Sequence, residues 1–129
     1  HNEKVVKKLK FYIQYIKEGK YRQEDVYGYT PFVVDLDDII RCESYNNYTK
    51  FFFQDGSKIL VTKTLKSYSD MLKNYQFLRV HQSHLVNLDC ISAFIKSDGG
   101  YLLLKNKETV PVSVRKKPEI IALLDQMHR

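Results

Sequence analysis

The sequence predicts a mainly β protein of small antiparallel sheets or hairpins, with one inserted helix and one terminal helix. Three observations lead to this expectation. Short runs of β-branched and aromatic residues recur along most of the chain. Turn-forming pairs such as Asp55-Gly56 separate several of these runs. Apolar residues take up helical spacing in only three places, near the N-terminus, after Leu65 and after Pro118.

The N-terminal segment, residues 1–24, is expected to be a helical linker or extension, and the main domain is expected over 25–129. An amphipathic helix is predicted over 3–18, because apolar residues such as Leu9 and Ile13 recur near helical spacing between lysines. The extension carries most of the net charge of +6, so the main domain is only mildly basic. A site for a polyanion would therefore depend on local clusters of cations.

The strands of the first half are predicted from composition and turns. Residues 31–41 combine apolar residues with three aspartates, which indicates a strand, a turn and a second strand. The aromatic run 48–54 and the aliphatic run 58–62 flank Asp55-Gly56, which is the strongest short-range sign of a hairpin.

In the second half, the spacing of apolar residues changes from that of a strand to that of a helix. A helix is predicted over 65–75, and a strand over 77–80 is followed by a polar loop over 81–89 that ends in a short apolar step. Pro118 is expected to open the terminal helix, because proline suits the first helical position. Three further strands, joined by two turns, are predicted over 90–96, 101–105 and 109–114.

Composition and motifs exclude several classes of protein. The 129 residues are 43% hydrophobic and 28% charged, which favours a single globular domain. No apolar run approaches the roughly 18 residues of a membrane span, so we expect a cytoplasmic protein without membrane contact. Cys42 and Cys90 are expected to be reduced thiols. No catalytic or cofactor-binding motif is present, and Asp37-Asp38 is best interpreted as a solvated turn, so we expect neither enzyme activity nor a cofactor.

A metal site is the strongest small-ligand alternative. His81 and His84 have an HxxH spacing, with Asp89 and Cys90 close behind. Zinc sites normally need four ligands at defined spacing, and no second cluster of ligands accompanies this one. We therefore expect no bound metal, and histidines that serve the structure or contact phosphate.

Three polar or basic loops favour a binding module. The basic turn Arg115-Lys116-Lys117 precedes the terminal helix, where cations oppose the helix dipole, so helix stability does not explain them. Residues 79–84 are rich in hydrogen-bond donors, and a glutamine or an arginine can contact base edges. Residues 44–50 form a third polar stretch, and Lys63 adds a further cation.

The order of motifs resembles that of the LytTR DNA-binding domain, the output module of many bacterial response regulators. The resemblance extends from about Phe32 to the terminal helix. Its most specific stretch is Phe77-Leu78-Arg79-Val80-His81-Gln82-Ser83-His84-Leu85-Val86-Asn87. Further matching motifs are Asp38-Ile39-Ile40-Arg41-Cys42-Glu43, Asn47-Tyr48-Thr49, Leu60-Val61-Thr62-Lys63-Thr64-Leu65 and Val110-Pro111-Val112-Ser113-Val114-Arg115-Lys116-Lys117.

The resemblance implies an elongated stack of small antiparallel β-sheets whose loops enter successive major grooves of promoter DNA. The base-reading positions of the family correspond here to Thr49, Gln82 and Arg115. Residues that contact the DNA backbone or support the site would be Asn47, Tyr48, Lys50, Lys63, Arg79, His81, Ser83, His84, Lys116 and Lys117.

The sequence therefore predicts a sequence-specific, double-stranded DNA-binding domain of a transcription regulator. The resemblance implies direct-repeat operators, a second copy bound on the same DNA, and a receiver domain N-terminal to this chain in a two-component regulator. The alternative is a non-catalytic protein-interaction module, which would bind a partner through its aromatic strands or the 3–18 helix.

Overall fold

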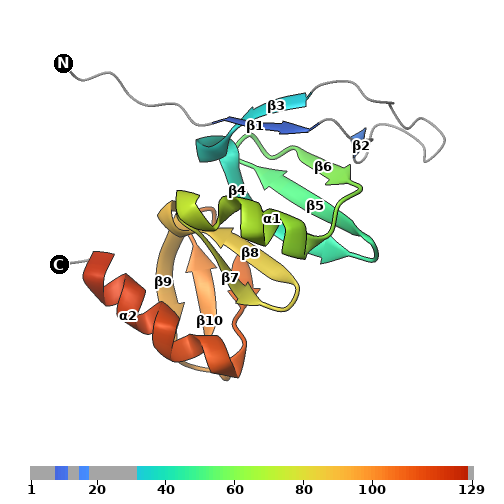
Figure 1. Ribbon diagram of the computed structural model, residues 1–129. Coiled ribbons are helices and arrows are strands. Elements are labelled where there is room, and N and C mark those ends of the chain that lie inside the picture. Colours follow the sequence, from blue (N-terminus) through green and yellow to red (C-terminus); the bar gives the residue numbers. More distant parts are fainter. Residues whose placement is uncertain (1–7, 12–14, 18–31, 128–129) are drawn as a thin grey trace, which may run out of the picture. The chain divides into compact units, whose positions relative to one another are not determined.

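Figure 1 shows the computed structural model, which describes residues 8–11, 15–17 and 32–127. The described chain is mainly β, with antiparallel strand pairs and two α-helices, as the sequence predicts. It divides into two compact units, residues 1–68 and 69–129. No helix in the described ranges has both the length and the apolar character that a membrane crossing requires.

The first unit consists of hairpins and one short strand pair. Strands β2, β6, β5 and β4 follow one another in that order, and β1 pairs with β3. The elements of this unit are β1 (Lys8–Phe11), β2 (Tyr15–Lys17), β3 (Phe32–Asp35), the 3-10 turn η1 (Leu36–Asp38), β4 (Ile39–Tyr45), β5 (Tyr48–Phe53) and β6 (Lys58–Val61).

The helix predicted over 3–18 is wrong for the residues that the structure describes. Lys8–Phe11 and Tyr15–Lys17 are strands that pair with β3 and β6. Aromatic and β-branched residues are frequent in this segment and fit a pleated surface. The strands that pair with β1 and β2 are distant in sequence, so the local helical spacing of apolar residues was misleading. An edge strand offers unpaired backbone groups with which such a distant segment can pair. The rest of 1–24 lies outside the described residues.

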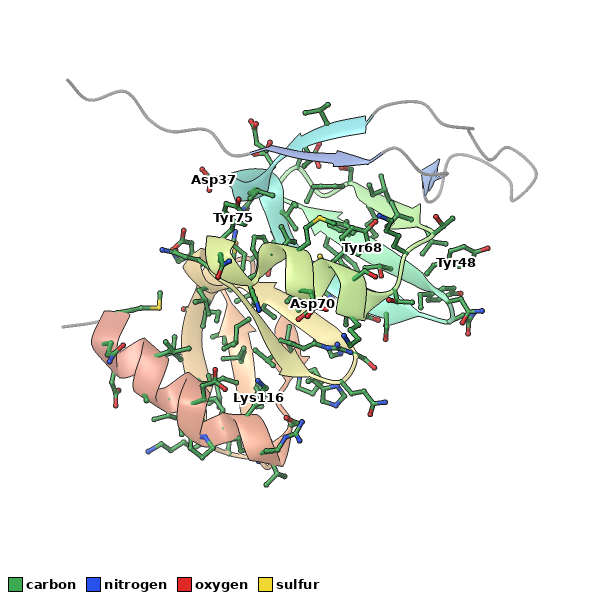
Figure 2. The ribbon with its side chains drawn as sticks, in the orientation of Figure 1. Asp37, Tyr48, Tyr68, Asp70, Tyr75 and Lys116 are labelled. Carbon is green, nitrogen blue, oxygen red and sulfur yellow. The ribbon has the colours of Figure 1, made fainter. Side chains whose placement is uncertain are left out.

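The core of the first unit follows the alternation of β5. Thr49, Phe51 and Phe53 are buried on one face, whereas the residues between them are partly exposed. Tyr68, on the helix that follows, points toward β5 and packs edge-on against Phe51, with ring centroids 4.8 Å apart (Figure 2). Because the Cys42 thiol is buried as well, burial raises its pKa above the ordinary value.

Helix α1 (Leu65–Leu72) begins in the first unit and ends in the second. The 3-10 turn η2 (Lys73–Tyr75) continues it, so together they match the predicted helix over 65–75. The other elements of the second unit are β7 (Phe77–His81), β8 (His84–Asn87), η3 (Leu88–Cys90), β9 (Ile91–Ile95), β10 (Tyr101–Leu104), β11 (Thr109–Pro111), η4 (Val114–Lys116) and α2 (Lys117–Met127).

In the second unit β7 and β8 form a hairpin, and β9, β10 and β11 form a three-stranded sheet. Helix α2 lies beside β9 and buries Ile120 and Leu124 (Figure 1). The predicted terminal helix is confirmed, and it begins at Lys117, one residue before the predicted start at Pro118. Strand β8 was not predicted, because its first half belongs to the polar run over 81–89.

Two glycines show how turn chemistry shapes the hairpins. Gly56 has φ +87°, as expected for the turn between β5 and β6. Gly100 has φ +92°, and a Cβ there would lie 2.8 Å from the ring of Phe94. The β9–β10 turn therefore needs glycine at position 100 for both backbone conformation and space. Cys42 and Cys90 are both buried and are not joined in a disulfide.

Candidate nucleic-acid interface

The turn between β7 and β8 presents Gln82. His81 and His84 are paired across the hairpin, so Gln82 and Ser83 form a two-residue turn. Neither turn residue has the positive φ of the turns that hairpins prefer. Side chains stabilise the turn instead: the Arg79 guanidinium donates to the Gln82 carbonyl at 2.5 Å, and the Ser83 N–H donates to His81 Nδ1 at 3.1 Å.

The two histidines of this hairpin lie next to each other, with ring centroids 5.3 Å apart. The Nδ1 of His81 is unprotonated in this arrangement, because it accepts a hydrogen bond from the Ser83 backbone. Among the described residues, no group of three or more His, Cys, Asp or Glu side chains could hold a metal ion. The hydrogen bond to Ser83 gives His81 a role in shaping the turn.

The basic turn at η4 is anchored to the same hairpin. The Ser113 N–H donates to the Val80 carbonyl at 2.9 Å, and the Lys116 N–H donates back to the Ser113 carbonyl at 3.0 Å. Two residues of chain span at most about 7 Å, so these bonds keep the backbones of Gln82 and Arg115 within roughly 20 Å. The structure thus brings two predicted base-reading residues into one part of the second unit.

The three cations of the basic turn have different surroundings. Lys116 lies 3.4 Å from a carboxylate oxygen of Glu119, and the Lys117 ammonium donates to the carbonyl of Gly99. Arg115 is exposed and makes no hydrogen bond or ion pair with any residue that the structure describes. Local contacts therefore account for the two lysines and leave the guanidinium of Arg115 available to a ligand.

Gln82 resembles Arg115 in this respect. Its side chain is exposed, and its amide makes no hydrogen bond within the described ranges, although its carbonyl accepts from Arg79. A primary amide can donate and accept at once, which suits paired contact with the edge of a base. Both side chains project from turns whose backbones are held by hydrogen bonds, an arrangement that limits the entropy lost on binding.

The polar stretch of the first unit is the turn between β4 and β5. Asn46 has φ +55°, and Asn46 and Asn47 are both exposed. Tyr48 is partly exposed and projects from the turn end of the hairpin (Figure 2). Lys50 lies on the same face, with its ammonium 4.6 Å from the centroid of the Tyr45 ring, which is a cation–π contact.

Thr49 does not present its side chain at this surface. It is 0% exposed, and its hydroxyl donates to the carbonyl of Lys63 at 2.7 Å. The alternation of β5 explains the placement, since Thr49 shares a face with buried Phe51. In this arrangement Thr49 ties β5 to the chain after β6, whereas the side chain of Lys63 is exposed.

Sequence reasoning missed two residues near these turns. Tyr45 is 49% exposed at the end of β4, and Val114 is 80% exposed beside Arg115. Tyr45 belongs to the polar stretch over 44–50, whereas no signal in the sequence predicts an exposed Val114.

The fold and the exposed polar turns define a class, a β-rich binding module whose available groups lie on turns rather than on a recognition helix. The model of the LytTr DNA-binding domain family matches residues 30–125. The chain therefore belongs to the LytTR family of DNA-binding domains. This is a family of binding domains rather than enzymes, in agreement with the prediction of a non-catalytic protein.

A solved structure has the same fold. It is the LytTr DNA-binding domain of a putative methyl-accepting/DNA response regulator from Bacillus cereus, with a TM-score of 0.63 and 22% identity. The match covers 86% of this chain and 96% of that one. A comparison with curated proteins found no match.

Proposed function

We propose that this chain is the sequence-specific, double-stranded DNA-binding domain of a transcription regulator, and that its turns read successive major grooves. Membership of the LytTR family supports DNA binding. The observation that carries the assignment of residues is the exposure of Gln82 and Arg115. Both side chains are uncommitted within the described residues, and both project from anchored turns.

Base contacts follow from the chemistry of these two side chains. Arginine donates two parallel hydrogen bonds to the O6 and N7 of guanine, and glutamine pairs in the same way with adenine. Arg115 is therefore assigned to a guanine and Gln82 to an adenine. In the first unit, Asn47 and Lys50 replace Thr49 as the proposed contacts, because Thr49 is buried.

Phosphate contacts would supply most of the affinity and its dependence on salt. Exchange of an intramolecular partner for a phosphate costs little at an exposed ion pair, so Lys116 remains suited to this role. The other residues assigned to the backbone or to support of the site are Tyr48, Lys63, Arg79, His81, Ser83, His84 and Lys117.

The biological setting is part of the same proposal. The chain would act in the cytoplasm as the output domain of a two-component response regulator, controlled by a receiver domain N-terminal to it. Two copies would occupy a direct repeat in promoter DNA. The similar Bacillus cereus domain is described as part of a putative methyl-accepting/DNA response regulator, which supports this setting.

Selection from a random duplex library, followed by sequencing, tests the central claim. Enrichment of a short motif, in particular as a direct repeat, is the expected result. DNA retained without enrichment would refute sequence-specific reading, and no retention at low salt would refute DNA binding altogether.

Variants test the assigned residues on the selected duplex. Arg115→Ala should cost about 1–3 kcal/mol in binding and relax one base position, and Gln82→Ala should relax another. Lys105→Ala is the matched control, since Lys105 is an exposed cation at the opposite end of β10 from η4. An unchanged selected motif with Arg115→Ala would remove that residue from the set of base readers.

Salt titration separates the DNA-binding domain from the protein-interaction module. Affinity for the duplex should fall steeply between low and moderate salt, whereas an apolar interface should barely respond. The structure also weakens the alternative, because Phe51 and Phe53 lie in the core and the described part of the 3–18 segment is strand rather than helix.

A further inference from the structure

Val114 is the most exposed large apolar side chain in the described part of the chain. It is 80% exposed, whereas no other such side chain there exceeds 49%. Single apolar residues at a surface are common, so exposure by itself carries no function. What distinguishes Val114 is its position, directly before Arg115 in the 3-10 turn η4.

The backbone on both sides of Val114 is fixed, and this imposes its outward position. Ser113 donates to the Val80 carbonyl and accepts from the Lys116 N–H, so the turn is closed around Val114. Val112 is buried before the turn, and Ile120 is buried in the helix after it. Because valine is stiff at χ1, its two methyl groups keep nearly one position relative to this backbone.

This arrangement gives Val114 no evident part in stabilising the fold. An exposed valine leaves its apolar surface in water, and a polar residue would suit the turn equally well. The next side chain, that of Arg115, is the one assigned to a guanine. A ligand held by Arg115 would therefore bring its neighbouring groups close to the methyl groups of Val114.

We propose that Val114 is a specificity-determining residue that contacts the 5-methyl group of a thymine in the base pair next to the guanine read by Arg115. This inference rests on the proposed function. In the major groove, thymine alone among the four bases presents a methyl group, and apolar side chains recognise it by contact. Arg115 distinguishes guanine from other bases by hydrogen bonds, and Val114 distinguishes thymine by apolar contact at the adjacent base pair.

Substitution of deoxyuridine for thymidine tests the contact, because it removes only the methyl group. The probe is the duplex selected with the wild-type chain, with each thymine within two base pairs of the Arg115-dependent guanine replaced in turn. At one of these positions the wild-type chain should lose about fourfold in affinity, the factor expected for burial of one methyl-sized group. Val114→Ala should bind the two duplexes with affinities that differ by much less.

A matched variant and a repeated selection complete the test. Val33→Ala, at a 45% exposed valine on β3, should keep the full preference for thymidine. Selection with Val114→Ala should keep the guanine and lose the thymine beside it.

The outcomes separate this inference from the proposed function. If wild-type binding is the same with deoxyuridine at every tested position, or if Val114→Ala keeps the thymine preference, the contact is refuted while guanine reading by Arg115 stands. If no motif is enriched with the wild-type chain, the proposed function fails, and this inference fails with it.

Discussion

Replacement of Thr49 by valine separates a structural role from a DNA-reading role. The substitution replaces one hydroxyl with a methyl group and keeps the β-branched shape of the side chain. In the folded protein this hydroxyl is fully buried and donates to the Lys63 carbonyl at 2.7 Å. The change therefore deletes one part-buried hydrogen bond and leaves its acceptor without that donor.

The expected cost follows from that bond. A typical intramolecular hydrogen bond contributes about 0.5–1.5 kcal/mol to the free energy of unfolding, and Thr49→Val should lose an amount in this range. For a chain of this size, each kcal/mol corresponds to a fall of roughly 3–6 °C in Tm. Urea unfolding and thermal scans of wild type and Thr49→Val would measure the difference directly.

Duplex binding supplies the second half of this test. At a temperature where both proteins are folded, Thr49→Val should bind the selected duplex as the wild type does and enrich the same motif. Thr62→Val is the control, because Thr62 is exposed and its substitution should change stability by less than about 0.5 kcal/mol. Unchanged stability together with an altered motif for Thr49→Val would refute the structural role and restore Thr49 as a base reader.

Three further predictions concern the turns and the core. Gly100→Ala should destabilise the fold more than Gly56→Ala in urea unfolding, because both have positive φ but only the former brings a Cβ within 2.8 Å of Phe94; equal losses would contradict this. Because burial raises the pKa of the Cys42 thiol, the unfolded chain binds fewer protons than the folded one above pH 9.0, the ordinary pKa. The free energy of unfolding should therefore fall above that pH, with a smaller slope in Cys42→Ala; identical slopes would rule out this contribution. Arg79→Ala should weaken duplex binding and relax the base preference of the β7–β8 turn, as anisotropy and selection would show, because the turn carbonyl loses its donor.

Local chemistry made the central hairpin and the two helices predictable. Asp55-Gly56 specifies a turn through the positive φ that Gly56 adopts, and the period change after Leu65 marks a helix through side chains on one face. Strand β8 escaped prediction because the Gln82–Ser83 turn contains no glycine or asparagine. Side chains of Arg79 and His81 stabilise that turn, and their contacts exist only in the folded hairpin.

The structure of the N-terminal strands and of the candidate interface depends on contacts between residues that are distant in the sequence. Lys8–Phe11 and Tyr15–Lys17 pair with strands far along the chain, and local spacing carries no information about such partners. The burial of Thr49 was accessible from the alternation with Phe51, whereas the isolation of Arg115 from its neighbours depends on Glu119 and Gly99 binding the adjacent lysines. A run of three cations thus contains one available group, which composition could not reveal.

The bond between the Ser113 N–H and the Val80 carbonyl has a consequence for how such domains change their target. It joins two main-chain groups, so substitutions at Gln82 and Arg115 leave it in place. Under the proposed function, the bases that these residues recognise would change with the side chains, while the interval between them would stay within one turn of the duplex. Substitutions in this part of the site would change which bases of the operator are recognised and would conserve the spacing between them.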